Sequence, residues 1–197
     1  MPDSSITKRA LAQALKDLMR TEPFSKISVG DICQACDMSR KSFYYHFRDK
    51  YDLVNWIFRS EFLQTVQPET YPNGWLLLAD MCAYFYREQT FYRSALLISG
   101  QNSFREYFGQ VIAPIILFFT RDIFDGVEHA DFYVTFFSDA ILASLIRWLT
   151  EGAQIPPEEY LGQLRHILLR LAQHTIVELD PSEGGAQAEA PALPGQT

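Results

Sequence analysis

Apolar side chains recur along this chain at intervals of three and four residues, and an alternation of period two is never sustained. Intervals of three and four place side chains on one face of an α-helix, whereas alternation is typical of β-strands. The pattern therefore predicts an all-α fold of about nine helices. Four helices are expected in the N-terminal part, at about 7–20, 29–36, 40–46 and 50–62. Five more are expected at about 75–87, 91–99, 103–124, 130–150 and 157–179.

Small polar residues mark where the short N-terminal helices begin. Ser28 precedes an apolar stripe and is followed three residues later by Asp31, which is the spacing of a capping box. Ser39 and Asp49 stand in the same relation to the third and fourth predicted helices. The second and third helices are therefore joined by a tight turn, in which Asp37 can take the left-handed backbone conformation at a modest cost.

A stretch that contains proline and glycine, 67–74, divides the helical pattern in two. We expect an N-terminal domain over residues 1–60, made of a three-helix helix-turn-helix and the start of a fourth helix. A larger helical domain for dimerisation and ligand binding is expected over 61–180. The tail, 181–197, is rich in Pro, Gly, Ala, Gln and Glu and has little to bury, so we expect it to be disordered.

Charge is distributed unevenly along the chain. The net charge of −7 argues against a nucleic-acid partner, but residues 1–60 hold ten Lys or Arg against seven Asp or Glu, a balance of +3. Within 40–50 the only acid is Asp49, and His46 adds to four basic side chains, Arg40, Lys41, Arg48 and Lys50. The sequence thus predicts a local basic patch on an acidic protein.

Two short helices joined by a tight turn and supported by a third are the form of a helix-turn-helix. In the third predicted helix, Phe43 and Phe47 share a face and can anchor it to a core. Other faces carry side chains that can contact base edges or phosphates in the major groove: Arg40, Lys41, Tyr44 and Tyr45. Ser28 could bind a phosphate through its hydroxyl and the neighbouring backbone N–H groups. The pattern therefore predicts binding to double-stranded DNA.

The stretch SVGDICQACDMSRKSFYYHFRDKYDLV resembles the signature of the TetR (TetR/AcrR) family of transcriptional regulators, and the likeness covers about residues 7–60. The resemblance implies that three side chains face bases: Arg40, Lys41 and Tyr45. It implies that five others position the DNA backbone: Ser28, Ser42, Tyr44, His46 and Lys50. It also implies a homodimer that binds a palindromic operator.

The chain departs from the family pattern at two places. Asp37 stands in the turn where many relatives have glycine, and we expect the turn to be kept. Cys33 and Cys36 stand where relatives often carry alanine. No second cysteine pair completes a zinc site, so we expect both thiols to pack in the interior, with a redox-sensitive role as the alternative.

The region after residue 60 contains 20 of the 28 aromatic residues. The family resemblance implies that an inducer pocket can lie here, but the pattern alone does not separate a pocket from a packed core. Wide apolar stripes on the last two helices predict a four-helix dimer interface. The stripes are Ile141, Leu142, Leu145, Ile146, Trp148 and Leu149 on one helix and Leu161, Leu164, Ile167, Leu168, Leu171 and Ile176 on the other.

The leading functional hypothesis is a repressor that an effector at the C-terminal domain releases from DNA or modulates. Two further stretches, FRDKYDLVNWIF and FYRSALLISGQNSFREYF, are similar to a subgroup that includes the regulator of dihydroxyacetone kinase operons. That similarity implies the alternative of an activator controlled by a protein co-regulator. A helical enzyme is the third hypothesis, but the chain offers no nucleophile with its base, no phosphate-binding glycine loop and no metal-ligand spacing. We therefore expect no catalysis, no cofactor and no metal.

Cellular location follows from the absence of targeting signals. The longest uninterrupted apolar run, 111–119, is far shorter than the ~20 residues that span a bilayer, and the N-terminus lacks a secretory pattern. Three cysteines cannot form a disulfide framework. We expect a cytoplasmic protein with no membrane partner.

Overall fold

The computed structural model describes residues 4–64, 66, 70–98, 103–121 and 128–179, and within these ranges the secondary structure is entirely helical. The predicted fold class is confirmed. By their internal contacts, the residues fall into two compact units, Met1–Pro157 and Glu158–Thr197. The expected domain boundary at residue 60 stays a prediction, and the expected disordered tail lies outside the described residues.

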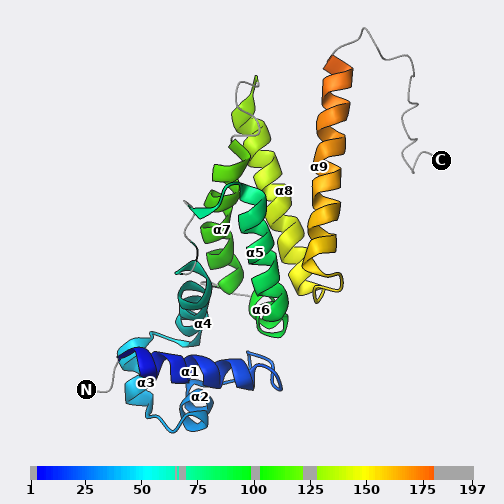
Figure 1. Ribbon diagram of the computed structural model, residues 1–197. Helices are drawn as coiled ribbons and strands as arrows, with labels where there is room; N and C mark the ends of the chain where they lie inside the picture. Colours follow the sequence, from blue (N-terminus) through cyan, green and yellow to red (C-terminus); the bar gives the residue numbers. More distant parts are fainter. Residues whose placement is uncertain (1–3, 65, 67–69, 99–102, 122–127, 180–197) are drawn as a thin grey trace, which may run out of the picture. The chain divides into compact units, whose positions relative to one another are not determined.

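The first three helices, α1 (Ser4–Leu18), α2 (Val29–Ala35) and α3 (Arg40–His46), pack against one another (Figure 1). The predicted positions hold, except that α1 begins three residues early and ends two residues early. Their shared core contains side chains with no solvent exposure, among them Leu11, Leu15, Ile32 and Phe43. Burial of each such side chain contributes about 1.5–3 kcal/mol, which fixes short helices that would be marginal alone.

The fourth predicted helix is two elements in the structure. An α-helix, α4 (Lys50–Phe58), continues directly into a five-residue π-helical turn, η1 (Arg59–Leu63). Phe58 and Phe62 both face the interior, with ring centroids 5.6 Å apart. Their four-residue spacing suits either helix type, so the hydrophobic pattern could not reveal the wider turn.

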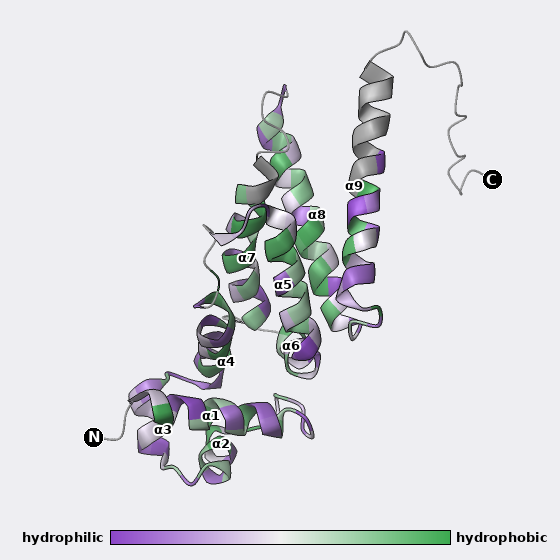
Figure 2. Ribbon diagram, in the orientation of Figure 1, coloured by the Kyte–Doolittle hydropathy of each residue, from purple (hydrophilic) through white to green (hydrophobic). Residues whose placement is uncertain are grey.

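The described residues of the first unit form four further α-helices: α5 (Gly74–Arg87), α6 (Gln89–Leu96), α7 (Phe104–Arg121) and α8 (Ala130–Thr150). Figure 2 shows α5, α7 and α8 as largely hydrophobic, whereas α1–α3 alternate hydrophilic and hydrophobic residues. Phe58 of α4 is fully buried at the centre of an aromatic cluster with Phe85, Tyr92, Phe104 and Phe108. This cluster holds α4 against the later helices.

Among the residues that the structure describes, α8 is the one helix that is long and apolar enough to cross a membrane. Its most apolar window has a mean hydropathy of 1.3. The length of uninterrupted apolar runs does not reveal this property of α8, because Asp139 and Arg147 interrupt the runs but lower the mean hydropathy only slightly. The same property is common in core helices of proteins that never enter a membrane, and α8 packs against α6 and α7.

The dimer stripe predicted on α8 is wrong for most of its residues. Five of the six are buried within the chain: Ile141, Leu145, Ile146, Trp148 and Leu149. The exposed face instead carries Phe132 and Phe136, which are 69% and 56% exposed with stacked rings. Because α8 is apolar on nearly every side, its sequence pattern could not show which side faces inward.

Helix α9 (Pro157–Leu179) has its predicted bounds, and from Glu158 onward it makes up the described part of the second unit. Of the apolar stripe predicted there, Ile167 is 54% exposed.

Candidate DNA interface

Helix α2 begins with the predicted capping box. The Ser28 hydroxyl oxygen accepts from the Asp31 N–H at 3.2 Å, and the Asp31 carboxylate accepts from the Ser28 N–H at 2.8 Å. Hydrogen bonding of the Asp31 carboxyl with the side chain and the backbone N–H of Ser28 lowers the pKa of Asp31, and the charges of Arg40 and Lys50 lower it further. Ser28 is solvent-exposed.

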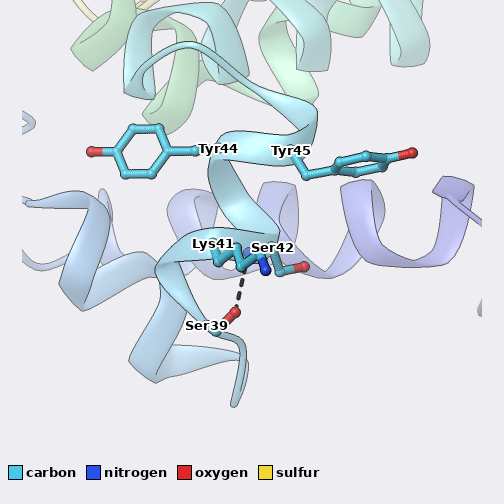
Figure 3. Close-up of a pocket in the computed structure, with 5 residues that line it drawn as sticks. All are labelled: Ser39, Lys41, Ser42, Tyr44 and Tyr45. Atoms are coloured by element: carbon cyan, nitrogen blue, oxygen red, sulfur yellow. Dashed lines mark hydrogen bonds between the residues drawn. The ribbon is translucent and has the colours of Figure 1, made fainter.

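The turn between α2 and α3 has the predicted geometry. Asp37 takes the left-handed conformation with φ of 53°, and the Met38 N–H donates to the Cys33 carbonyl at 2.9 Å. Ser39 then caps α3 by accepting from the Ser42 N–H at 3.1 Å, drawn as a dashed line in Figure 3. The direction of α3 relative to α2 is therefore set by local hydrogen bonds.

The two cysteines of α2 serve packing in this structure. Cys33 is buried, and the Cys36 thiol donates to the Ile32 carbonyl at 3.3 Å. Burial raises the pKa of both thiols, which disfavours the reactive thiolate. These observations support the packing interpretation over the redox alternative. Among the described residues, no cluster of three or more His, Cys, Asp or Glu side chains could hold a metal ion.

The side chains that anchor α3 to the core and those that are exposed to solvent lie on different faces of the helix. Phe43 and Phe47 are 0% and 3% exposed, as predicted, whereas Tyr44 and Tyr45 are 59% and 81% exposed. Figure 3 shows the two tyrosine rings projecting on opposite sides of α3. A shallow, open depression on the same helix is lined by Ser39, Lys41, Ser42, Tyr44 and Tyr45. Large exposed aromatic rings beside a lysine suit a surface that contacts a partner.

Arg40, the first residue of α3, lies beside α2. A side chain placed at Gly30 would overlap the Arg40 guanidinium, so glycine at this position leaves room for the arginine. Arg40 remains solvent-exposed. Its guanidinium is therefore available at the junction of the two helices of the motif.

His46 ends α3 close to a cation that the sequence analysis did not select. Partial burial lowers the pKa of His46, and the charge of Lys8 on α1 lowers it further. Because this pKa is lowered, the imidazole is mostly neutral at pH 7. The Lys8-Arg9 pair near the start of α1 was the available sequence signal, but nothing in the pattern placed it beside His46.

Lys50 has a different environment from the one expected of a backbone contact. Its ammonium donates to the carbonyls of Phe24 and Ile27 at 2.7 and 2.6 Å and lies 4.3 Å from the centroid of the Phe24 ring. Burial lowers its pKa. Two of its three N–H donors are thus used within the protein, where they hold the loop that leads into Ser28.

The structure therefore gathers the predicted residues into three groups. Four share the surface of α3: Lys41, Ser42, Tyr44 and Tyr45. Ser28, Arg40 and Lys50 lie around the start of α2, and His46 lies apart, at the end of α3 beside Lys8. Their contacts with DNA stay a prediction.

Two family models match the chain. One, described as bacterial regulatory proteins of the tetR family, matches residues 8–57, and the other, a transcriptional regulator C-terminal region, matches residues 76–170. The chain is also 33% identical over 111 residues to the HTH-type dhaKLM operon transcriptional activator DhaS of Lactococcus lactis subsp. lactis. That match covers 55% of this chain and 57% of the relative, so the chain spans little more than half the length of this curated protein.

Solved structures with the same fold include a dihydroxyacetone kinase operon activator, with 25% identity and a TM-score of 0.63 over 87% of this chain and 98% of that one. NalD, the secondary repressor of the MexAB-OprM multidrug efflux pump in Pseudomonas aeruginosa, has 16% identity and a TM-score of 0.63 over 85% and 97%. Thermus thermophilus FadR, a repressor in complex with lauroyl-CoA, has 17% identity and a TM-score of 0.56 over 95% and 100%. The last two likenesses concern the fold alone.

Proposed function

We propose, because the chain belongs to the TetR family of bacterial regulatory proteins, that it is a DNA-binding transcriptional regulator. The observation that carries this proposal is the division of α3 into a buried Phe43 and Phe47 anchor and an exposed face of Lys41, Tyr44 and Tyr45. The family models and the curated relative describe regulators, in agreement with the expectation that the chain is not an enzyme. We expect the protein to act in the cytoplasm, where its DNA target lies.

In this proposal α3 enters the major groove. Arg40, Lys41 and Tyr45 contact base edges, because all three side chains are exposed on α3. The backbone is positioned by Ser28, Ser42, Tyr44, His46 and Lys50. The basic patch lies on a chain of net charge −7, so the rest of the surface repels DNA and favours one docking face.

We propose further that the chain acts as a homodimer on a palindromic operator, since two half-sites need two copies of α3 related by a two-fold axis. The exposed phenylalanines of α8, Phe132 and Phe136, are the residues we place in the interface. Ile167 on α9, which belongs to the predicted stripe of that helix, is also exposed.

The sign of regulation has two candidates. A repressor modulated by a small-molecule effector is the hypothesis that the family resemblance favours. An activator controlled by a protein co-regulator gains support from two observations. The curated relative is named as an activator, and fully buried aromatic rings, including Phe58, Tyr92 and Phe104, fill the space between α4, α6 and α7.

The proposal is tested by selecting bound duplexes from a random DNA library and titrating the selected site with variants. Replacing Arg40 or Lys41 by alanine is expected to cost about 1–3 kcal/mol of binding free energy and to relax the preference at one base position in each half-site. Arg147→Ala is the matched control, because it removes an exposed cation from α8. If no duplex is enriched, or if all three variants behave alike, α3 does not read DNA.

The two signs of regulation are separated by a reporter gene placed behind the selected site. Expression that rises when the regulator is deleted identifies a repressor, and expression that falls identifies an activator. Purified protein is then titrated on the operator with and without the products of adjacent genes. A change in affinity caused by one of these proteins supports the co-regulator hypothesis over a small-molecule effector.

A further inference from the structure

Lys16, in the last turn of α1, is held by two carboxylates from distant parts of the chain. Its ammonium lies 2.9 Å from the Glu61 carboxylate and 2.9 Å from the Glu88 carboxylate, and the lysine side chain is only 13% exposed. Burial opposes its charge, but the hydrogen bonds and charges of Glu88 and Glu61 raise its pKa overall. The ammonium is also 5.7 Å from the centroid of the Phe91 ring. Such a shielded, doubly paired cation is held in place far more firmly than an exposed one.

One of the two acceptors is itself fixed by the aromatic interior. The oxygen of Glu61 that contacts Lys16 also accepts from the Tyr84 hydroxyl at 3.3 Å, and the Tyr84 and Tyr92 hydroxyls lie 2.8 Å apart. Tyr92 has no solvent exposure, and its ring contacts Phe85 and Phe104. The Glu61 carboxylate therefore cannot follow Lys16 without disturbing a packed cluster.

Lys16 connects the helices that carry the DNA-contacting surface to those that do not. Helix α1 packs against α2 and α3, so its position determines where α3 points. Glu61 belongs to the π-helical turn η1, and Glu88 joins α5 to α6. The covalent route from α3 to α5 runs through η1 as well, where the helical hydrogen-bond register changes and a helix bends readily. The three charged side chains thus bridge this π-helical turn.

We propose that the Lys16–Glu61–Glu88 cluster fixes the orientation of α1–α3 relative to α5–α8 and so sets the half-site spacing that the dimer recognises. Lys16 is a positioning residue, because it acts on DNA through the placement of α3. This inference rests on the proposed function of a dimeric DNA-binding regulator. With the cluster intact, the two copies of α3 hold one separation, whereas without the ammonium the two carboxylates repel and the orientation broadens.

The test compares operators in which two selected half-sites are separated by spacers that differ by one base pair. Lys16→Met keeps the length and apolar stem of the side chain and removes the charge. Its matched control is Arg20→Met, which removes a cation two residues after the end of α1, where Arg20 forms an exposed pair with Asp17 at 3.6 Å. Lys16→Arg restores a cation, and Glu88→Gln tests one acceptor. Each variant is also titrated on an isolated half-site, and its unfolding in urea is recorded.

Wild type, Arg20→Met and Lys16→Arg are expected to prefer one spacing. Lys16→Met is expected to lose about tenfold or more of that preference, within the range of couplings between sites in proteins, with its half-site affinity unchanged. Glu88→Gln should lie between them. If Lys16→Met keeps the wild-type spacing preference, or if it weakens all spacings and the isolated half-site equally, the cluster only stabilises the fold and the inference is overturned. If wild type selects no duplex at all, the proposed function fails, and this inference fails with it.

Discussion

Lys50 is the residue for which the family resemblance and the structure suggest different tasks, and Lys50→Met separates them. Methionine keeps the apolar stem against Phe24 but removes the ammonium that bonds the Phe24 and Ile27 carbonyls. A hydrogen bond to a charged group contributes about 1.5–3 kcal/mol, and an exposed cation–π contact about 0.5–1 kcal/mol. The site is only partly buried, so water can replace part of these interactions in the variant. We therefore expect a loss of about 2–4 kcal/mol in the free energy of unfolding.

The assay is urea unfolding followed by circular dichroism, without DNA, at fixed protein concentration because a dimer's stability depends on it. Lys41→Met is the control, since it makes the same substitution at a lysine that is exposed on α3, and it should change the unfolding free energy by less than about 0.5 kcal/mol. A loss below about 0.5 kcal/mol for Lys50→Met would refute the structural role. The salt dependence of operator binding then measures any phosphate contact, because losing one lowers the slope by about one unit.

Three further predictions concern single side chains. Asp37→Ala should lower the unfolding free energy by about 1 kcal/mol while Asp37→Gly leaves it unchanged or higher, because position 37 has φ of 53°; equal losses in urea unfolding would show that the turn does not depend on this conformation. Burial and Lys8 lower the pKa of His46, so the unfolded chain binds a proton first; stability should fall as the pH drops below about 6.5, and His46→Gln should remove that part of the fall, which a pH series of urea midpoints would check. Burial raises the pKa of Cys82 to about 12, so iodoacetamide at pH 8 should modify it only as fast as the chain unfolds; rapid labelling of Cys82 in the folded protein, read by peptide mass spectrometry, would contradict its burial.

The features that could be predicted from the sequence depend on residues close together along the chain. Ser28 and Asp31 form their capping box within one helical turn, and Ser39 caps α3 in the same way. Phe43 and Phe47 are four residues apart, so they lie on the same side of α3 and face inward together when the helix packs. Asp37 takes the left-handed conformation that a short turn between two helices requires.

Interactions between residues far apart were not visible in the pattern. Lys50 is 23 and 26 residues from the carbonyls it bonds, and the family resemblance assigned its charge to the DNA backbone. Lys16 had no assigned task, because its partner Glu61 is 45 residues away and belongs to a π-turn that periodicity does not distinguish from an α-helix. For both lysines, the partner depends on which distant groups tertiary packing brings within reach of the ammonium.

The sequence by itself determined that this protein is helical, where the capped helices α2, α3 and α4 begin, and that two short helices present a basic, aromatic surface suited to DNA. Each of these properties follows from hydrogen bonds and side-chain spacing within a few residues. Tertiary structure alone decided which side of α8 is buried, what Lys50 holds and how Lys16 ties α1 to the aromatic interior. Those outcomes depend on which surfaces contact one another when separate helices pack. An apolar helix or a single lysine is compatible with several packing arrangements.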